Sequence, residues 1–271
     1  MIKKGVRIRF LLVAVLGIAA TAAAFPAQAG AAARAGLVRY AAQDPAAAHV
    51  TLRGTKVAGG GCRFTATGTG SAGETTAVQQ VETAFDAATC TSYLDRTEVA
   101  AGTTATATVT RSGGSGRGAA GTTAGPEEGV SAQVASCYNP YRSTAYYYSS
   151  DACIHSWFQD AYGNHLNDVR NEVQWNPYNG CATYGYSYAS NYWSYASGWI
   201  NYLNGWTPSF SCSGVTSQSS VGFYTNSYCG YSYDYYSPGY LTGYGDGSYA
   251  WSVTWYKSSS CTMAFGLLNE S

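Results

Sequence analysis

A cluster of polar residues in the middle of the chain has side chains that could do acid–base or metal chemistry. Imidazole and carboxylate groups that lie close together supply a general acid and base, or ligands for a metal ion. His165 and Asp168 are three residues apart, a spacing that aligns two side chains on a helix but sends them to opposite faces of a regular strand. A secreted hydrolase is therefore one hypothesis, and a polar surface loop without activity explains the residues as well. The cluster consists of His155, Asp160, His165, Asp168 and Glu172.

A second stretch, near the end of the chain, is crowded with aromatic and acidic residues that suit carbohydrate binding. Exposed rings stack on the apolar faces of sugars, and neighbouring carboxylates or amides bind the hydroxyls. Glycine and proline interrupt the stretch, which is typical of a binding loop. The alternative is that the rings fill the core, because aliphatic residues are scarce in this half of the chain. The candidate ligand-binding residues are Tyr233, Asp234, Tyr235, Tyr236, Tyr240, Tyr244 and Asp246.

The sequence lacks the common catalytic motifs. It has no Gly-x-Ser-x-Gly elbow, no His-Glu-x-x-His and no phosphate-binding glycine loop that opens a helix. Its acidic residues could supply a pair for glycoside hydrolysis, but no spacing singles out two of them. There is also no Cys-x-x-Cys pair of the kind found in zinc sites. These absences favour a protein that is not an enzyme, and we expect neither a cofactor nor a metal.

Cysteines and aromatic rings are the elements that must hold these residues in place. The chain has 8 cysteines, 25 tyrosines and 7 tryptophans, and every tryptophan lies beyond Cys137. So many cysteines in even number indicate disulfides and an oxidising location. Cys62 and Cys90 are the two in the first half and should pair. The other six allow 15 pairings, and nearest-neighbour pairing predicts Cys137–Cys153, Cys181–Cys212 and Cys229–Cys261.

The first 29 residues have the three parts of a secretory signal peptide. A basic segment precedes an apolar run of about 15 residues, which is short for a membrane span, and Ala27-Gln28-Ala29 supplies a cleavage site. Cleavage would remove four of the 15 basic residues and none of the 15 acids, so the mature chain is net negative. Nucleic-acid binding needs clustered basic residues and is excluded. We expect an extracellular protein without a membrane span.

Alternating polar and apolar residues predict an all-β, sandwich-like fold. Residues 30–111 form a small N-terminal β unit, residues 112–133 a flexible Gly/Ala/Ser/Thr linker, and residues 134–271 an aromatic-rich β domain with three disulfides. The N-terminal unit is small enough that one composite domain is an alternative. Residues 166–173 also fit a helical period, but the β-rich neighbourhood favours a strand. Residues 249–255 and 261–267 both alternate and predict a hairpin.

Three features resemble secreted proteins of uncharacterised function from high-GC actinobacteria. They are the Ala/Gly-rich leader, the stretch from Cys62 to Cys90, and the turn Trp175-Asn-Pro-Tyr-Asn-Gly-Cys181. The resemblance covers much of the chain, but its motifs are structural. It implies an extracellular location and no particular activity.

The leading hypothesis for function is a secreted, non-enzymatic protein that binds a polysaccharide or a cell surface through exposed aromatic rings. The secreted hydrolase is the first alternative, and an extracellular structural or antagonistic factor is the second. Neither the ligand nor the oligomeric state follows from the sequence.

Overall fold

The structure is a computed structural model of the chain. It describes residues 37–58, 60–100, 106–107, 132–133, 137, 148–160, 163–194, 198–225, 232–257 and 263–271, with the backbone alone at 100, 106–107, 132–133 and 232–238. These residues form strands and turns and no helix, so no described helix could cross a membrane. The all-β prediction is therefore confirmed. Residues 35–271 form one compact unit.

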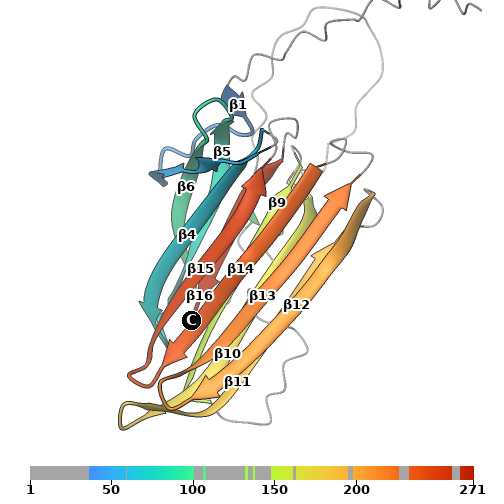
Figure 1. The fold of residues 1–271 in the computed structure, drawn as a ribbon. Coiled ribbons are helices and arrows are strands. Elements are labelled where there is room, and N and C mark those ends of the chain that lie inside the picture. The colour runs from blue at the N-terminus through green and yellow to red at the C-terminus, as the bar shows by residue number, and fades with distance from the viewer. Residues whose placement is uncertain are drawn as a thin grey trace, which may run out of the picture. The chain divides into compact units, whose positions relative to one another are not determined.

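Two antiparallel sheets face each other in this unit (Figure 1). Sheet A has the order β11-β10-β9-β16-β5-β6-β2, with β1 also paired to β5. Its strands are β1 (Leu37–Arg39), β2 (Ala48–Arg53), β5 (Thr76–Asp86), β6 (Thr91–Ala100), β9 (Ser150–Gln159), β10 (His165–Tyr178), β11 (Cys181–Trp193) and β16 (Ala264–Glu270).

Sheet B has the order β12-β13-β14-β15-β4-β3. Its strands are β3 (Thr55–Lys56), β4 (Cys62–Ser71), β12 (Trp199–Ser211), β13 (Gly214–Thr225), β14 (Ser232–Tyr244) and β15 (Ser248–Lys257), and a separate short pair joins β7 (Thr106–Ala107) to β8 (Ala132–Gln133). Strand β4 pairs with β15, and β5 pairs with β16. Strands from the two halves of the sequence therefore share both sheets.

The hairpin predicted for residues 249–267 is wrong. Strand β15 lies in sheet B between β14 and β4, whereas β16 lies in sheet A between β9 and β5. The alternation of both segments is real, because each turns one face toward the interior between the sheets. Two strands that cover the same interior from opposite sides have the same pattern as two strands of a hairpin.

The expected strand over residues 166–173 is confirmed as part of β10. Val169, Val173 and Trp175 are buried on its inner face. The strand ends in a two-residue turn, in which Asn179 and Gly180 have φ angles of 51° and 76°. Positive φ at both positions defines the type I′ turn that an Asn-Gly pair favours, and it sets the register of the hairpin from β10 to β11.

Tryptophan and phenylalanine rings fill the interior between the sheets. Trp255 stacks on Phe265 with ring centroids 3.7 Å apart, and on Phe64 at 5.5 Å. Tyrosines contribute little, because Tyr249 is the one tyrosine in the buried class among those whose side chains are described. Most tryptophans therefore pack in the interior, whereas most described tyrosines keep their hydroxyl near water.

Three of the four predicted disulfides are formed: Cys62–Cys90, Cys137–Cys153 and Cys181–Cys212. Cys229 and Cys261 lie outside the described residues. The first and third bridges join sheet A to sheet B at opposite ends of β15, because Cys62 pairs with Lys257 and the Cys212 turn lies beside Tyr244. Each closes a loop of about 30 residues, which stabilises the fold by roughly 3–4 kcal/mol in the loop-entropy model.

The two sheets differ in how they are covered. Strands β4 and β15 of sheet B alternate buried with more exposed residues, as a sheet with one solvated face does. Strands β9 and β16 of sheet A are buried almost continuously, on both faces. The outer face of sheet A therefore holds polar side chains away from water.

Candidate functional site

The edge strands of the two sheets, β11 and β12, lie side by side along one edge of the sandwich (Figure 1). We call the contacts between them the β11–β12 seam; they come from Gly185, Tyr188 and Asn191 on β11 and from Asn201, Asn204, Trp206 and Phe210 on β12. Five of the seven tryptophans are buried, and the two exposed ones, Trp193 and Trp206, are both on these edge strands.

The seam has three consecutive contacts. At one end, Phe210 lies against Gly185, where a Cβ atom would be 2.3 Å from the phenylalanine ring, so a larger residue would displace that ring. In the middle, the rings of Tyr188 and Trp206 have centroids 6.5 Å apart. Aromatic rings therefore make the first two contacts of the seam, one of them with Gly185.

Amide side chains continue the seam beyond the rings. Asn191 Nδ2 donates to Asn204 Oδ1 at 3.0 Å, and Asn201 Nδ2 donates to Asn191 Oδ1 at 3.5 Å. Amides donate and accept hydrogen bonds at the same group. Exposed rings and adjacent amides are the two kinds of group that sugar recognition needs.

Buried polar residues hold the Trp206 ring in position. Its Nε1 donates to Ser217 Oγ at 3.3 Å, and the same hydroxyl is 3.1 Å from Asn171 Oδ1. Asn171 in turn donates to Ser219 Oγ at 2.9 Å. Trp206 remains 44% exposed. A ring that is fixed before binding loses little conformational entropy when a ligand stacks on it.

The aromatic stretch predicted from the sequence lies on β14 and the turn after it. Tyr240 and Tyr244 are exposed on the outer face of sheet B. Asp246 accepts hydrogen bonds from the backbone and hydroxyl of Ser248, which lower the pKa of its carboxyl and stabilise the turn. The side chains of Tyr233, Asp234, Tyr235 and Tyr236 are not described, so their proposed role stays a prediction.

The histidine cluster is positioned by a β-bulge. His165 pairs with Gln159 and Asn167 pairs with Phe158, so one extra residue of β10 is inserted between them. The bulge changes the alternation and brings His165 and Asp168 to the same face of sheet A. The expectation that a strand would send these two side chains to opposite faces is therefore wrong, because it assumed a regular strand.

Three side chains meet on this outer face: His155, His165 and Asp168. One ligand atom from each lies within 4.8 Å of the other two. His155 Nε2 is 3.3 Å from Asp168 Oδ2, but the contact does not have hydrogen-bond geometry, and neither nitrogen of His155 has a hydrogen-bond partner. His165 Nε2 also lacks one. These three residues thus lie in strands, with His155 and Asp168 buried and His165 partly buried, so the surface-loop alternative is wrong for them.

The protonation states follow from burial. Burial lowers the pKa of His155, against the opposing effect of Asp168. Burial, aided by His155, lowers the pKa of His165 to about 4. Burial would raise the pKa of Asp168, but His155 and Arg170 outweigh it and lower that pKa. At neutral pH the cluster holds two neutral imidazoles and one carboxylate, which is the form that binds metal ions.

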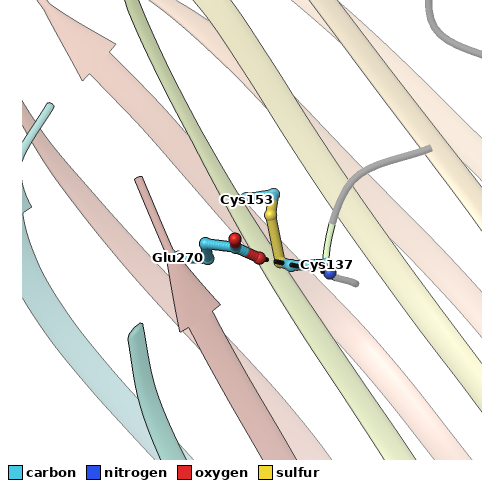
Figure 2. Close-up of side chains that lie close together, drawn as sticks. All are labelled: Cys137, Cys153 and Glu270. Atoms are coloured by element: carbon cyan, nitrogen blue, oxygen red, sulfur yellow. Dashed lines mark hydrogen bonds between the residues drawn. A yellow bond between two sulfur atoms is a disulfide. The ribbon is translucent and has the colours of Figure 1, made fainter. Parts of the chain in front are cut away.

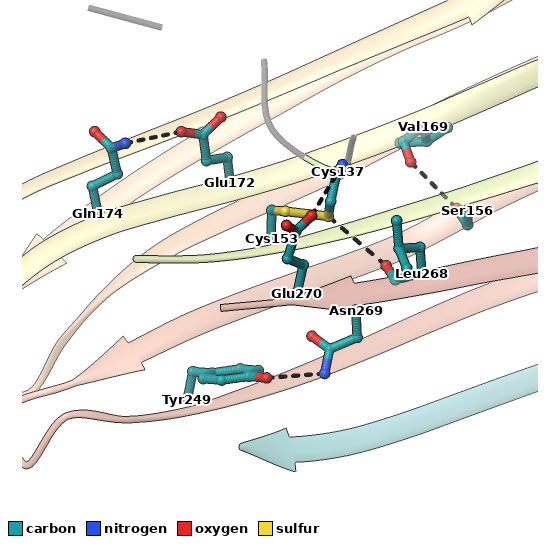
Figure 3. Close-up of a disulfide and its surroundings, with 10 residues drawn as sticks. All are labelled: Cys137, Cys153, Ser156, Val169, Glu172, Gln174, Tyr249, Leu268, Asn269 and Glu270. Atoms are coloured by element: carbon teal, nitrogen blue, oxygen red, sulfur yellow. Dashed lines mark hydrogen bonds between the residues drawn. A yellow bond between two sulfur atoms is a disulfide. The ribbon is translucent and has the colours of Figure 1, made fainter. Parts of the chain in front are cut away.

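The other two residues of the predicted cluster lie elsewhere. Asp160 accepts hydrogen bonds from the backbone and side-chain nitrogens of Asn164, in the turn before β10. Glu172 pairs in register with Cys153 and accepts from Gln174 Nε2 at 3.1 Å (Figure 3). The structure therefore brings three of the five residues together.

A second group with metal-ligand atoms consists of Cys137, Cys153 and Glu270 (Figure 2). The two cysteines form a disulfide, so neither offers a thiolate. Glu270 accepts a hydrogen bond from the backbone nitrogen of Cys137 at 3.3 Å. The group therefore fastens Cys137 to β9 and β16.

The seam residues were not predicted, although the sequence contained a signal. Three asparagines and three tryptophans, Asn191, Asn201, Asn204, Trp193, Trp199 and Trp206, occur within 16 residues of one another. That density of rings and amides is higher than in most of the chain. What the sequence does not show is that β11 and β12 are edge strands of different sheets.

No family model, curated protein or solved structure matches this chain. The function must therefore be argued from the sites themselves.

Proposed function

We propose that the protein is an extracellular, non-enzymatic carbohydrate-binding protein, and that the β11–β12 seam is its binding site. The observation that carries the proposal is Trp206, an exposed ring fixed by buried hydrogen bonds and followed along the seam by amide side chains. The signal peptide predicted for residues 1–29 and the disulfides support secretion.

The chemistry of the seam suits a neutral polysaccharide. A sugar ring offers an apolar face, which stacks on Trp206 or Phe210, and equatorial hydroxyls, which the amides of Asn191 and Asn204 can bind. The contacts repeat along the strands, so successive sugar units could be bound in a row. The secreted hydrolase is favoured less, because His155 has no exposed surface.

The test is retention of the purified protein on insoluble cell-wall and plant polysaccharides, followed by titration with soluble fragments of any polymer that retains it. Trp206→Ala should lower the affinity at least about tenfold, because tryptophan is the residue type that most often dominates a binding site. Asn204→Ala should lower it less.

The matched control is Tyr240→Ala combined with Tyr244→Ala, which removes two exposed rings from the outer face of sheet B. The control should bind like the wild type. If the control loses binding and Trp206→Ala does not, the site is the stretch on β14. If no polysaccharide retains the wild type, the proposed function is wrong.

A further inference from the structure

The side chains of His155, His165 and Asp168 bring three potential metal-ligand atoms close together. A buried imidazole nitrogen without a partner is costly, at roughly 1–3 kcal/mol. Here His155 Nε2, which is 3.3 Å from Asp168 Oδ2, and His165 Nε2 both lack a hydrogen-bond partner, and each imidazole can give one nitrogen to a shared ion. In the part of the chain that the structure describes, this is the one location where several unpartnered nitrogens face a carboxylate at close range.

We propose that these three residues bind a divalent transition-metal ion, for which zinc is the natural probe. Two imidazoles and one carboxylate suit borderline ions such as Zn²⁺, with a water molecule in the remaining position. The ligand atoms lie within 4.8 Å of one another. Pairs of ligands about 2 Å from one ion are roughly 3–4 Å apart, so binding needs only small side-chain movements.

The surroundings of the cluster favour the same conclusion. The Trp157 ring stacks on His165 with centroids 4.9 Å apart and lies 5.0 Å from His155, so it fixes both imidazoles. His155 comes from β9, and His165 and Asp168 come from β10 on either side of the bulge. An ion at this point fastens the bulge to the neighbouring strand.

Arg170 gives the proposal a signature of its own. Its guanidinium lies 3.6 Å from Asp168 Oδ2, and its positive charge opposes a cation bound to the same carboxylate. Removal of this charge should therefore strengthen metal binding, by about tenfold at the effective dielectric of a protein. If the histidines serve only to pack the fold, loss of the ion pair between Arg170 and Asp168 should not raise the affinity for zinc.

The experiment is calorimetric titration of Zn²⁺ into the purified, tag-free protein after treatment with a chelator and alkylation of free thiols. The expected stoichiometry is one ion per chain. His165→Gln and Asp168→Asn should each weaken binding about 100-fold or more, since even the outer partners of a metal ligand are worth about 10–100-fold. Arg170→Gln should tighten it. Near-UV circular dichroism establishes that each variant is folded.

The matched control is His49→Gln. His49 Nδ1 lies 2.9 Å from Asp95 Oδ1, so the control removes a histidine that has a carboxylate partner but belongs to no three-ligand group among the described residues. Zinc binding by the control should be unchanged. Absence of stoichiometric zinc binding overturns the proposal. So does a loss in His49→Gln equal to that in His165→Gln, or folded ligand variants that bind zinc like the wild type. None of these results bears on polysaccharide retention, so the two proposals fail separately.

Discussion

Two buried polar clusters in this fold solve the same problem differently. The first joins the sheets: Lys257 of β15 forms an ion pair with Glu82 of β5, between the layers. The second is the histidine cluster on the outer face of sheet A. Glu82, Lys257, His155 and Asp168 have almost no exposed surface, and His165 is partly buried. The difference lies in how completely their hydrogen-bonding capacity is used.

The Glu82 cluster is saturated. The carboxylate accepts from Lys257 Nζ, from Ser92 Oγ at 2.8 Å and from the backbone nitrogen of Phe265 at 3.1 Å. The ammonium lies over the rings of Tyr40 and Phe85 at 4.4 and 4.7 Å, where cation–π attraction adds to the ion pair. The histidine cluster leaves three ring nitrogens without a hydrogen bond, and one of them, His155 Nε2, has only its ion-pair contact with Asp168. A saturated cluster needs no further partner, whereas an unsaturated one leaves polar atoms that a water molecule or an ion can bind.

The largest expected effect comes from breaking the saturated cluster. Glu82→Gln leaves the Lys257 charge buried without its counter-charge, and the free energy of unfolding should fall by about 3–5 kcal/mol. Urea denaturation monitored by fluorescence measures it. Replacement of both residues, as Glu82→Leu with Lys257→Met, should cost less than the single change, because no uncompensated charge remains. A single variant that loses less than about 1 kcal/mol would show that water reaches the pair.

Part of this cluster could have been predicted from the sequence. Every second residue from Tyr249 to Trp255 is apolar, and Lys257 occupies the next position of this series. A strand therefore places Lys257 on the same buried face as Trp255. A lysine there requires a buried partner. Which acid provides it cannot be predicted, because Glu82 is 175 residues away and belongs to the other sheet.

The same limit explains most of what the sequence did and did not predict. Local patterns predicted the strand over residues 166–173 and the turn at Asn179-Gly180, because each depends on neighbours in sequence. The described disulfides follow the pairing of nearest cysteines along the chain. The partner of β16 and the bulge near His165 depend on register between distant strands. One inserted residue changed which side chains share a face, and alternation alone carries no signal for such an insertion.

The histidine cluster should make the fold sensitive to acid. The pKa of His165 is lowered from 6.5 to about 4 in the folded protein, because burial and His155 disfavour its charged form. The unfolded chain therefore takes up this proton first as the pH falls. Above about pH 6.5, His165 is neutral in both states and does not make the free energy of unfolding depend on pH. As the pH falls from 6.5 toward 4, the free energy of unfolding decreases by roughly 3 kcal/mol because of this residue.

Denaturation of the chelator-treated protein at pH 7 and pH 4.5 tests this dependence. In His165→Asn the fall in stability between the two pH values should be clearly smaller than in the wild type. His155, whose pKa is also lowered, leaves a residual fall in the variant. Equal falls in the two proteins would mean that His165 is more solvated than the structure indicates.

The smallest effect, and the most specific to the unsaturated cluster, comes from Gly266 of β16. It pairs in register with Trp157, and a Cβ atom there would lie 2.1 Å from Cε2 of the indole. Gly266→Ala must therefore displace the ring that stacks on His165, at a cost of about 1–3 kcal/mol. Gly205→Ala on β12 is the control, because its nearest neighbour would be a backbone oxygen at 3.4 Å.

Denaturation of the two glycine variants, with zinc titration of each, distinguishes a rigid indole support from a passive cover. Gly266→Ala should lose stability and bind zinc more weakly, because His165 no longer has a fixed ring behind it. Gly205→Ala should do neither, and neither variant should change the coupling between Glu82 and Lys257, which lie on the inner side of the sandwich. If the Gly266 variant is as stable as the control and binds zinc as tightly, Trp157 moves without effect on the histidines. The two clusters would then differ only in their hydrogen bonds and not in the rigidity of their surroundings.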